Sequence, residues 1–157
     1  MKIDYGRASA ADSPKLIDLR LAYRREDGGD MPPEAEKTFR ERLAAYFPAH
    51  VDRDLLVFAA RGEDGEILSC CFLQVTEKPP GLAFPTGRVG TVLNVYTRPG
   101  FRHRGLARRL MALLLDQARA LKLDLVELKA TEDGYPLYCA LGFRECGEHY
   151  RLMQIRP

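Results

Sequence analysis

The chain has 157 residues, 46% of them hydrophobic and 29% charged, with a formal net charge of +2. A length near 150 residues is typical of one domain and lets about 68–70% of the unfolded chain's surface become buried, so residues 1–157 are expected to form a single domain. The hydrophobicity and small net charge exclude a disordered chain, and no run of about 18 apolar residues is present that could form a transmembrane helix.

Hydrophobic periodicity divides the first half of the chain into five elements. Apolar residues at three- and four-residue spacing indicate helices, and short runs of consecutive apolar residues indicate buried strands. Asp12 suits the N-cap of the first helix, Gly28-Gly29-Asp30 suits its end, and Pro32-Pro33 suits the start of the second. The elements are a strand over residues 3–7, these two helices, and strands over 55–60 and 67–75 joined by a turn at 62–65.

The second half of the chain begins with a loop over residues 78–87, because three prolines exclude the interior of a helix or strand. The elements that follow are a strand over 89–96, an amphipathic helix after Pro99-Gly100, a strand over 123–130, a short helix over 131–141 that Gly142 ends, and a closing hairpin of strands over 143–146 and 149–155. The order β-α-α-β-β-β-α-β-α-β-β predicts an α/β domain with a mixed sheet.

The stretch 94–107 is the most informative of the chain, because a strand ends, a turn rich in glycine and arginine follows, and a long helix begins. The first N–H groups of a helix have no partner within it and carry positive partial charge, so they bind phosphate groups. Gly105 lets the backbone approach an anion closely, and Arg102 and Arg104 add formal charge. No acidic residue occurs within 78–115. The pattern predicts an anion site for a phosphorylated cofactor.

Two common phosphate loops do not match this stretch. Gly100 and Gly105 have the glycine spacing of a nucleoside-triphosphate loop, but Leu106-Ala107 stands where that loop needs a lysine and a hydroxyl. No G-x-G-x-x-G follows a predicted strand, which argues against dinucleotide binding.

Two motifs, considered together, resemble those of the GCN5-related N-acetyltransferase (GNAT) family. Arg102-x-x-Gly105-x-Ala107 matches the pyrophosphate signature of that family, Q/R-x-x-G-x-G/A. Leu137-Tyr138 and the following Leu141-Gly142-Phe143 are similar to its later motif. The order of predicted elements is also that of the family, so the resemblance covers essentially the whole chain.

The resemblance implies a mixed sheet whose central strands, at 89–97 and 123–130, splay apart to leave a notch for acetyl-CoA. Tyr138 is implied as the general acid near the cofactor sulfur. Thr131 stands where the family often has asparagine. The asparagine amide contacts the cofactor, and the Thr131 hydroxyl is expected to replace part of that contact. The implied cofactor-binding residues are Val95, Tyr96 and Thr97 through their backbone at the pantetheine arm, Arg102, His103, Arg104, Gly105, Leu106 and Ala107 around the pyrophosphate, and Thr131.

The implied reaction is the attack of a neutral amine on a thioester carbonyl, and a backbone N–H near Val95 or Tyr96 could stabilise the oxyanion by about 2.7–4 kcal/mol. A lysine-like amine with a pKa of ~10.4 is only about one part in a thousand neutral at pH 7, so a base is needed. Glu127 is the first candidate, although it lies one residue away from the register of the family's glutamate, and such an offset reverses the face of a strand. Glu132 and His149 are further candidates.

The expected acceptor is a primary amine of a small molecule or peptide. Four acidic residues of the segment 24–36 lead to the hypothesis of a negative field that attracts a cationic amine. They are Glu26, Asp27, Asp30 and Glu34. The oligomeric state is left open, with a homodimer as one option.

The cysteines and the start of the chain bear on compartment and metal. The four cysteines have no C-x-x-C spacing and no Cys/His spacing suited to zinc, so no metal is expected. Small buried thiols suit a reducing compartment, and the charged start Met1-Lys2-Ile3-Asp4 differs from the apolar stretch of a secretory signal. We therefore expect a cytoplasmic protein without a membrane partner.

Two other functional classes are open to test. A non-catalytic domain of the same fold would bind acetyl-CoA as a sensor or interaction module, without releasing thiol when an amine is added. A nucleic-acid-binding module would use the basic residues of 98–109, but the modest overall charge and the leucine face of the helix argue against it, so no nucleic-acid partner is expected.

Overall fold

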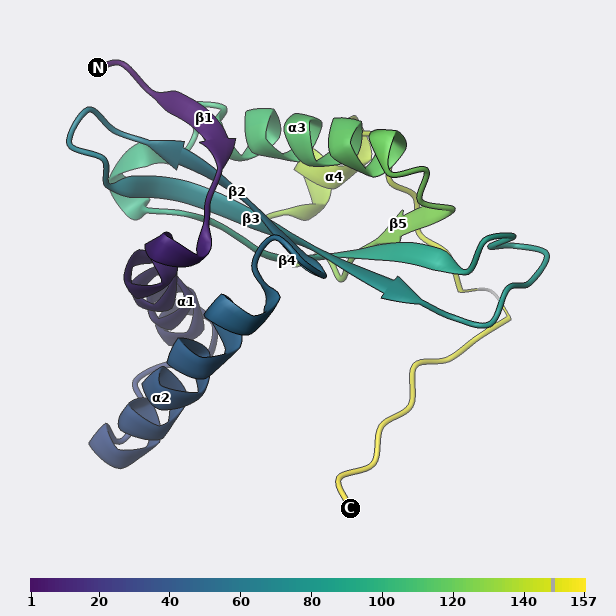
Figure 1. The fold of residues 1–157 in the computed structure, drawn as a ribbon, viewed down its shortest axis with the longest axis horizontal. Coiled ribbons are helices and arrows are strands. Elements are labelled where there is room, and N and C mark those ends of the chain that lie inside the picture. Colours follow the sequence, from purple (N-terminus) through teal and green to yellow (C-terminus); the bar gives the residue numbers. More distant parts are fainter. Residues whose placement is uncertain (148) are drawn as a thin grey trace.

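The computed structural model describes residues 1–147 and 149–157, which form a five-stranded mixed sheet with helices on both faces (Figure 1). The strands are β1 (Asp4–Arg7), β2 (Leu55–Arg61), β3 (Ile67–Glu77), β4 (Arg88–Thr97) and β5 (Leu125–Glu127). The helices are α1 (Ser13–Gly28), α2 (Pro33–His50), α3 (Leu106–Ala120) and α4 (Tyr135–Ala140), with 3₁₀ turns at Ala10–Asp12 and Pro99–Phe101. No helix in the described part of the chain is long and apolar enough to cross a membrane.

The strands follow one another across the sheet in chain order, antiparallel except for the parallel pair β4–β5. Helices α1 and α2 cover one face, and α3 and α4 cover the other (Figure 1). Successive side chains of a strand point to opposite faces, so Leu55 and Val57 of β2 enter the core under α1 and α2, while Leu56 and Phe58 enter the core under α3. Burial on both faces explains why β2 is a continuous apolar run.

Strands β4 and β5 separate after a short pairing, as the resemblance implied. Their ladder joins only residues 89–91 of β4 to residues 125–127 of β5, where β5 ends. Residues 92–97 of β4 pair with β3 alone among the described strands. The backbone on the β5 side of this half of β4 therefore forms an open edge in the middle of the fold.

The predicted elements are confirmed up to the short helix, with two differences in extent and one in helix capping. The strand predicted over 123–130 is only β5, and the short helix begins at Tyr135 rather than at 131. Asp12 stands at the N-cap of α1, but its carboxylate accepts a hydrogen bond from the Ser9 N–H and pairs with Arg61 instead of capping the helix.

The predicted closing hairpin is wrong. No strand is present in residues 143–147 or 149–157, and the chain from 149 to 157 is exposed throughout and extends away from the sheet (Figure 1). Alternating apolar residues suit a strand only when an edge offers backbone partners along the same length, and β5 is three residues long.

The end of α4 follows its local sequence closely. Gly142 adopts a φ of 95°, which glycine accepts more easily than other residues. The Gly142 N–H donates to the Cys139 carbonyl at 3.0 Å, and the Phe143 N–H donates to the Tyr138 carbonyl at 3.0 Å. These two bonds form a Schellman motif, as the predicted glycine cap requires.

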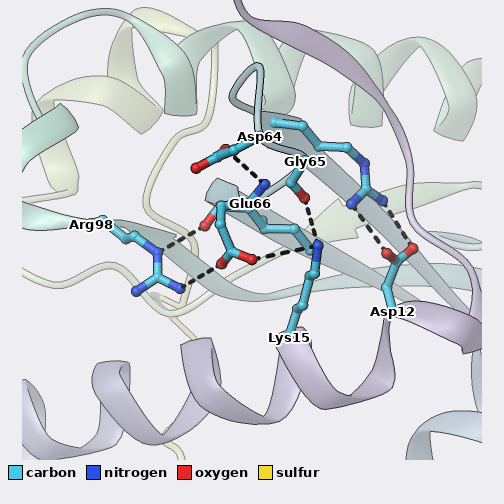
Figure 2. Close-up of polar contacts among 8 residues, drawn as sticks. Asp12, Lys15, Asp64, Gly65, Glu66 and Arg98 are labelled. Atoms are coloured by element: carbon cyan, nitrogen blue, oxygen red, sulfur yellow. Dashed lines mark hydrogen bonds and ion pairs between the residues drawn. The ribbon is translucent and has the colours of Figure 1, made fainter.

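Ion pairs hold the β2–β3 turn against α1 and the end of β4 (Figure 2). Lys15 of α1 donates to the Gly65 carbonyl at 2.8 Å and lies 3.5 Å from Glu66. Arg98, just after β4, donates through Nε to the Ile67 carbonyl at 2.9 Å and lies 3.9 Å from the same glutamate. Arg98 therefore belongs to the scaffold, although it occurs in the basic stretch of the sequence.

Candidate functional site

A β-bulge lies at the open edge of β4. The register between β3 and β4 shifts between Cys70 and Phe72, so that Asn94 and Val95 together stand opposite Cys71. Asn94 has a φ of 52°, in the left-handed region that a bulge residue can adopt. The bulge bends the strand and re-aims the side chains that follow it.

Asn94 is buried, and its side chain is held from both ends. Its Oδ1 accepts a hydrogen bond from Nη1 of Arg20 on α1 at 3.0 Å, and its Nδ2 donates to Sγ of Cys70 at 3.5 Å. Beyond the bulge, Val95 packs against the α3 core and Tyr96 against the α1 core. The structure thus brings Val95, Tyr96 and Thr97 to the open edge of β4, the residues for which the resemblance implied contact with the pantetheine arm.

The turn between β4 and α3 presents a row of free backbone donors. The N–H groups of residues 103–108 have no hydrogen-bond partner among the described residues. Gly105 precedes α3 with a φ of 79°, and a Cβ there would meet nothing within 4 Å. His103 also has a positive φ, 59°. Leu106, in contrast, is buried in the core and anchors the start of α3.

Arg102, the first residue of the signature, is tied to α1. Its Nη2 lies 2.5 Å from Oε2 of Glu26, and its Nε donates to the Thr97 carbonyl at 2.9 Å. The guanidinium lies over the Tyr96 ring at 5.6 Å from the centroid, and the Tyr96 hydroxyl donates to Glu26 at 2.8 Å. Partial burial raises the pKa of Glu26, but the hydrogen bonds from Arg102 and Tyr96 lower it on balance.

Some of the remaining arginines of the basic stretch contact the rest of the fold, and one is exposed at the turn before α3. Arg88 donates to the Leu121 carbonyl at 2.9 Å, and Arg109 lies over the Tyr5 ring, so both brace the fold. Arg104 is exposed beside the free N–H groups, with its guanidinium 5.4 Å from the centroid of Phe101. Arg102 and Arg104 therefore place positive charge beside the free N–H groups.

Tyr138 is buried under the bulge on the α3 side. Its side chain shares a core cluster with Cys71, the residue opposite the bulge, and its ring meets Phe143 edge-on at 6.0 Å. Burial raises the pKa of Tyr138 to about 12, and Cys71 and Tyr23 add to the rise. Tyr23 lies on α1, which covers the opposite face of the sheet.

Thr131 lies near Tyr138, because a Cβ at Gly134 would lie 3.3 Å from the Thr131 Oγ1 and 2.8 Å from Cε2 of Tyr138, whereas Glu127 lies apart from both. The Thr131 hydroxyl accepts the Gly134 N–H at 3.2 Å and so helps start α4. Glu127 is exposed at the end of β5, and no hydrogen bond or ion pair joins its carboxylate to a described residue. Because Val126 packs into the cluster that contains Tyr138, alternation directs Glu127 to the other face. The structure does not bring the two predicted catalytic side chains together.

Sequence reasoning missed two contacts made by α1. The sequence predicts that Glu26 belongs to an acidic surface that attracts the amine, but its carboxylate contacts Arg102 and Tyr96 instead. Arg20 was not singled out, although it lies four residues after Leu16 in the apolar stripe of α1. A charge within an apolar helix stripe is the signal that could have identified it.

Comparisons with known proteins agree with this geometry. The family model described as acetyltransferase (GNAT) family matches residues 16–143. No curated protein sequence is similar enough to count as a match. The described residues contain no cluster of three His, Cys, Asp or Glu side chains that could hold a metal ion.

Solved structures share the fold over nearly their full lengths. A predicted acetyltransferase from Clostridium acetobutylicum, solved with acetyl-CoA, is 24% identical, with a TM-score of 0.78 and coverage of 97% of this chain and 96% of that one. A GCN5-related N-acetyltransferase from Ralstonia eutropha is 23% identical, with a TM-score of 0.80 and coverage of 97% and 99%. A ribosomal-protein-alanine N-acetyltransferase from Brucella melitensis is 20% identical, with a TM-score of 0.71 and coverage of 99% of both chains.

Proposed function

Because this chain belongs to the GCN5-related N-acetyltransferase family, we propose that it transfers the acetyl group of acetyl-CoA directly to a primary amine of a small molecule or peptide in a ternary complex. The observation that carries the proposal is the row of free N–H groups at residues 103–108, directly beside the open edge of β4. An anion-binding turn and an unpaired strand edge together suit a long cofactor with a diphosphate at one end.

The residues at the site fit acetyl-CoA. The N–H groups of residues 103–108 match the acceptor oxygens of a diphosphate, and Gly105 leaves the backbone open to close approach. Arg102 and Arg104 add two charges, and the backbone of residues 95–97 would hold the pantetheine arm. Thr131, exposed before α4, would contact the cofactor through its hydroxyl. When bound, acetyl-CoA supplies an acetyl group activated as a thioester.

Two groups of the chain would stabilise the charge that develops during transfer, one at the carbonyl oxygen and one at the thioester sulfur. As the amine nitrogen bonds to the acetyl carbon and the carbon–sulfur bond breaks, negative charge passes through the carbonyl oxygen to the sulfur. A backbone N–H at the bulge, near Val95, stabilises the oxygen, an effect typically worth about 2.7–4 kcal/mol. Tyr138, with a pKa of about 12, is protonated at neutral pH and would donate its proton to the leaving sulfur. Because a free thiol has a pKa of ~8.5, this transfer requires that desolvation in the closed site make the thiolate more basic.

The amine must also lose a proton. Glu127 is exposed at the end of β5, where that strand leaves β4, and it takes this proton through solvent. Its position on the face opposite Tyr138 keeps the base away from the acid. The variant Glu127→Gln is expected to lower kcat at pH 7 and to recover as the pH rises toward the pKa of the amine.

Two measurements test the proposal. Calorimetry with acetyl-CoA and desulfo-coenzyme A tests the cofactor site, and thiol release with a panel of amines tests transfer. Tyr138→Phe is expected to lower kcat about 100-fold or more, with cofactor affinity unchanged within twofold. Tyr135→Phe is the matched control, because Tyr135 is on the same helix but 43% exposed.

The outcomes separate the candidate functions. Equal turnover by wild type and Tyr138→Phe across pH would show that Tyr138 is not the acid. Binding of acetyl-CoA without thiol release for any amine would favour the non-catalytic acyl-CoA-binding domain. Absence of acetyl-CoA binding would contradict both.

A further inference from the structure

Helix α1 places one arginine against the bulge of β4. Nη1 of Arg20 donates to Oδ1 of Asn94 at 3.0 Å, and the two residues are 74 positions apart in the chain. Arg20 is half-buried, in the stripe that includes Leu16 and Tyr23. Its guanidinium therefore lies beside the residue that precedes Val95, where the amine would meet the carbonyl carbon.

Arg20 has no carboxylate partner among the described residues, unlike the other arginines of its helix. Arg24 lies 3.0 Å from Asp27, and Arg25 lies 2.6 Å from Glu36, both near the exposed end of α1. Burying a charge is expensive unless an opposite charge or several hydrogen bonds compensate for it. The least exposed arginine of α1 is thus the one that lacks an anion.

The surroundings of Arg20 are neutral or cationic. Burial lowers its pKa, with a further contribution from Arg24, while the hydroxyls of Tyr23 and Tyr46 and the Cys70 thiol oppose the change. A guanidinium remains charged and offers five N–H donors in a planar fork. Asn94 accepts one of these donors, and the others remain for a ligand.

We infer that the amine acceptor carries a free carboxylate on the same small molecule, and that Arg20 binds this carboxylate beside the bulge. The inference depends on the proposed function and deepens it by naming the acceptor class as amino acids and their small derivatives. A guanidinium and a carboxylate match in geometry, because two parallel N–H···O bonds can form. Arg20 also disfavours a positive charge on the amine, which helps the neutral nucleophile to form.

The acidic residues near the site do not compensate for Arg20. Glu26 is engaged by Arg102 and Asp27 by Arg24, so two of the four acids expected to attract a cationic amine are already neutralised. A polyamine would bring additional positive charge next to Arg20. The structure therefore favours an anionic group on the acceptor over a second cation.

The test compares amines that differ only in the carboxylate. Thiol release is measured with acetyl-CoA and a panel of L-amino acids, the corresponding amino acid amides, and the polyamines putrescine and spermidine. Hydrogen bonds to charged groups contribute about 1.5–3 kcal/mol, so kcat/KM of the wild type is expected to be about 10- to 100-fold higher for the best acid than for its amide.

Variants assign the preference to Arg20. In Arg20→Gln the preference is expected to fall to within about threefold, through a higher KM for the acid, while the affinity for acetyl-CoA is unchanged. Arg24→Gln is the matched control, one turn further along α1 and paired with Asp27, and it should keep the preference. Asn94→Asp places a competing carboxylate on Arg20 and should remove the preference even if Arg20→Gln fails to fold.

The possible failures are distinguishable. No thiol release with any amine would contradict the proposed function itself. Turnover of amides or polyamines equal to or faster than that of the acids would overturn the carboxylate inference and leave acetyl transfer intact. A preference for acids that persists in both Arg20→Gln and Asn94→Asp would assign the carboxylate to another residue.

Discussion

We predict that the ion pair between Glu26 and Arg102 competes with the binding of coenzyme A, so that removing it tightens this binding. Arg102 is the first residue of the pyrophosphate signature, yet its Nη2 lies 2.5 Å from Glu26. To reach a diphosphate, the guanidinium must leave this carboxylate. Glu26→Gln removes the negative charge and keeps an oxygen that can accept the Tyr96 hydrogen bond.

The size of the effect follows from the exposure of the pair. The side chains of Arg102 and Glu26 are 38% and 42% exposed, so solvent screens their attraction. Pairs of this kind contribute about 0.2–1 kcal/mol, which corresponds to a factor of about 1.4–5 in affinity. We therefore expect the Kd for coenzyme A to fall by a factor of about 1.4–5 in Glu26→Gln.

Calorimetry with desulfo-coenzyme A at low and physiological salt measures the change directly. Asp27→Asn is the matched control, because it also removes one negative charge from the end of α1, but Asp27 pairs with Arg24. The gain should shrink with added salt, because screening weakens exposed pairs. It should also vanish in the background of Arg102→Gln.

One result would refute the reasoning. If Glu26→Gln bound desulfo-coenzyme A no more tightly than Asp27→Asn, the ion pair would not compete with the cofactor. Weaker binding in Glu26→Gln would instead indicate that Glu26 holds Arg102 in the orientation that the cofactor needs.

Three further predictions concern the packing around the site. A Cβ at Gly134 would lie 2.8 Å from Cε2 of Tyr138, so Gly134→Ala should displace that ring and lower kcat at least tenfold with little change in cofactor affinity; an unchanged kcat would show that the ring position is unimportant. Leu110 of α3 is fully buried in the core between that helix and the sheet, and Leu110→Ala should lower the free energy of unfolding by about 2.7–5 kcal/mol in urea titrations; a loss below 1 kcal/mol, on the order of a surface substitution, would contradict the packing. Burial raises the pKa of the Cys70 thiol from 9.0 to about 12. Between these values the folded protein keeps a proton that the unfolded chain loses, so the free energy of unfolding should fall above pH 9 by about 1.4 kcal/mol per pH unit for this group. Urea unfolding at pH 8, 9 and 10 should show a smaller slope in Cys70→Ala than in wild type, and equal slopes would place the effect elsewhere.

Local sequence was sufficient for the elements whose causes are local. The leucine face of α3 follows from helical spacing, because it must cover the sheet on one side. The end of α4 followed from Gly142, because few residues accept the backbone conformation of that cap. The free N–H groups of residues 106–108 also followed, because every helix start leaves its first N–H groups without a partner in the helix.

The failed hairpin shows where local patterns stop being informative. Residues 149–155 include four apolar or aromatic side chains that suit a strand, but a strand exists only where another edge supplies backbone partners. That edge would be β5, which the sequence predicted to be eight residues long, over 123–130, and which the fold limits to three. The sequence of residues 149–155 does not contain the length of the neighbouring strand β5, and that length decides whether these residues can pair.

The sequence by itself determined the family and the glycine-containing turn before α3, since both are encoded in contiguous residues whose backbone conformation is nearly independent of the rest. Only the tertiary structure decided which side chains meet across the site. Glu26 reaches Arg102 across 76 positions and Arg20 reaches Asn94 across 74, because the sheet places α1 against the end of β4. Contacts of that kind depend on strand register and helix packing together, so they cannot be derived from any one segment of the chain.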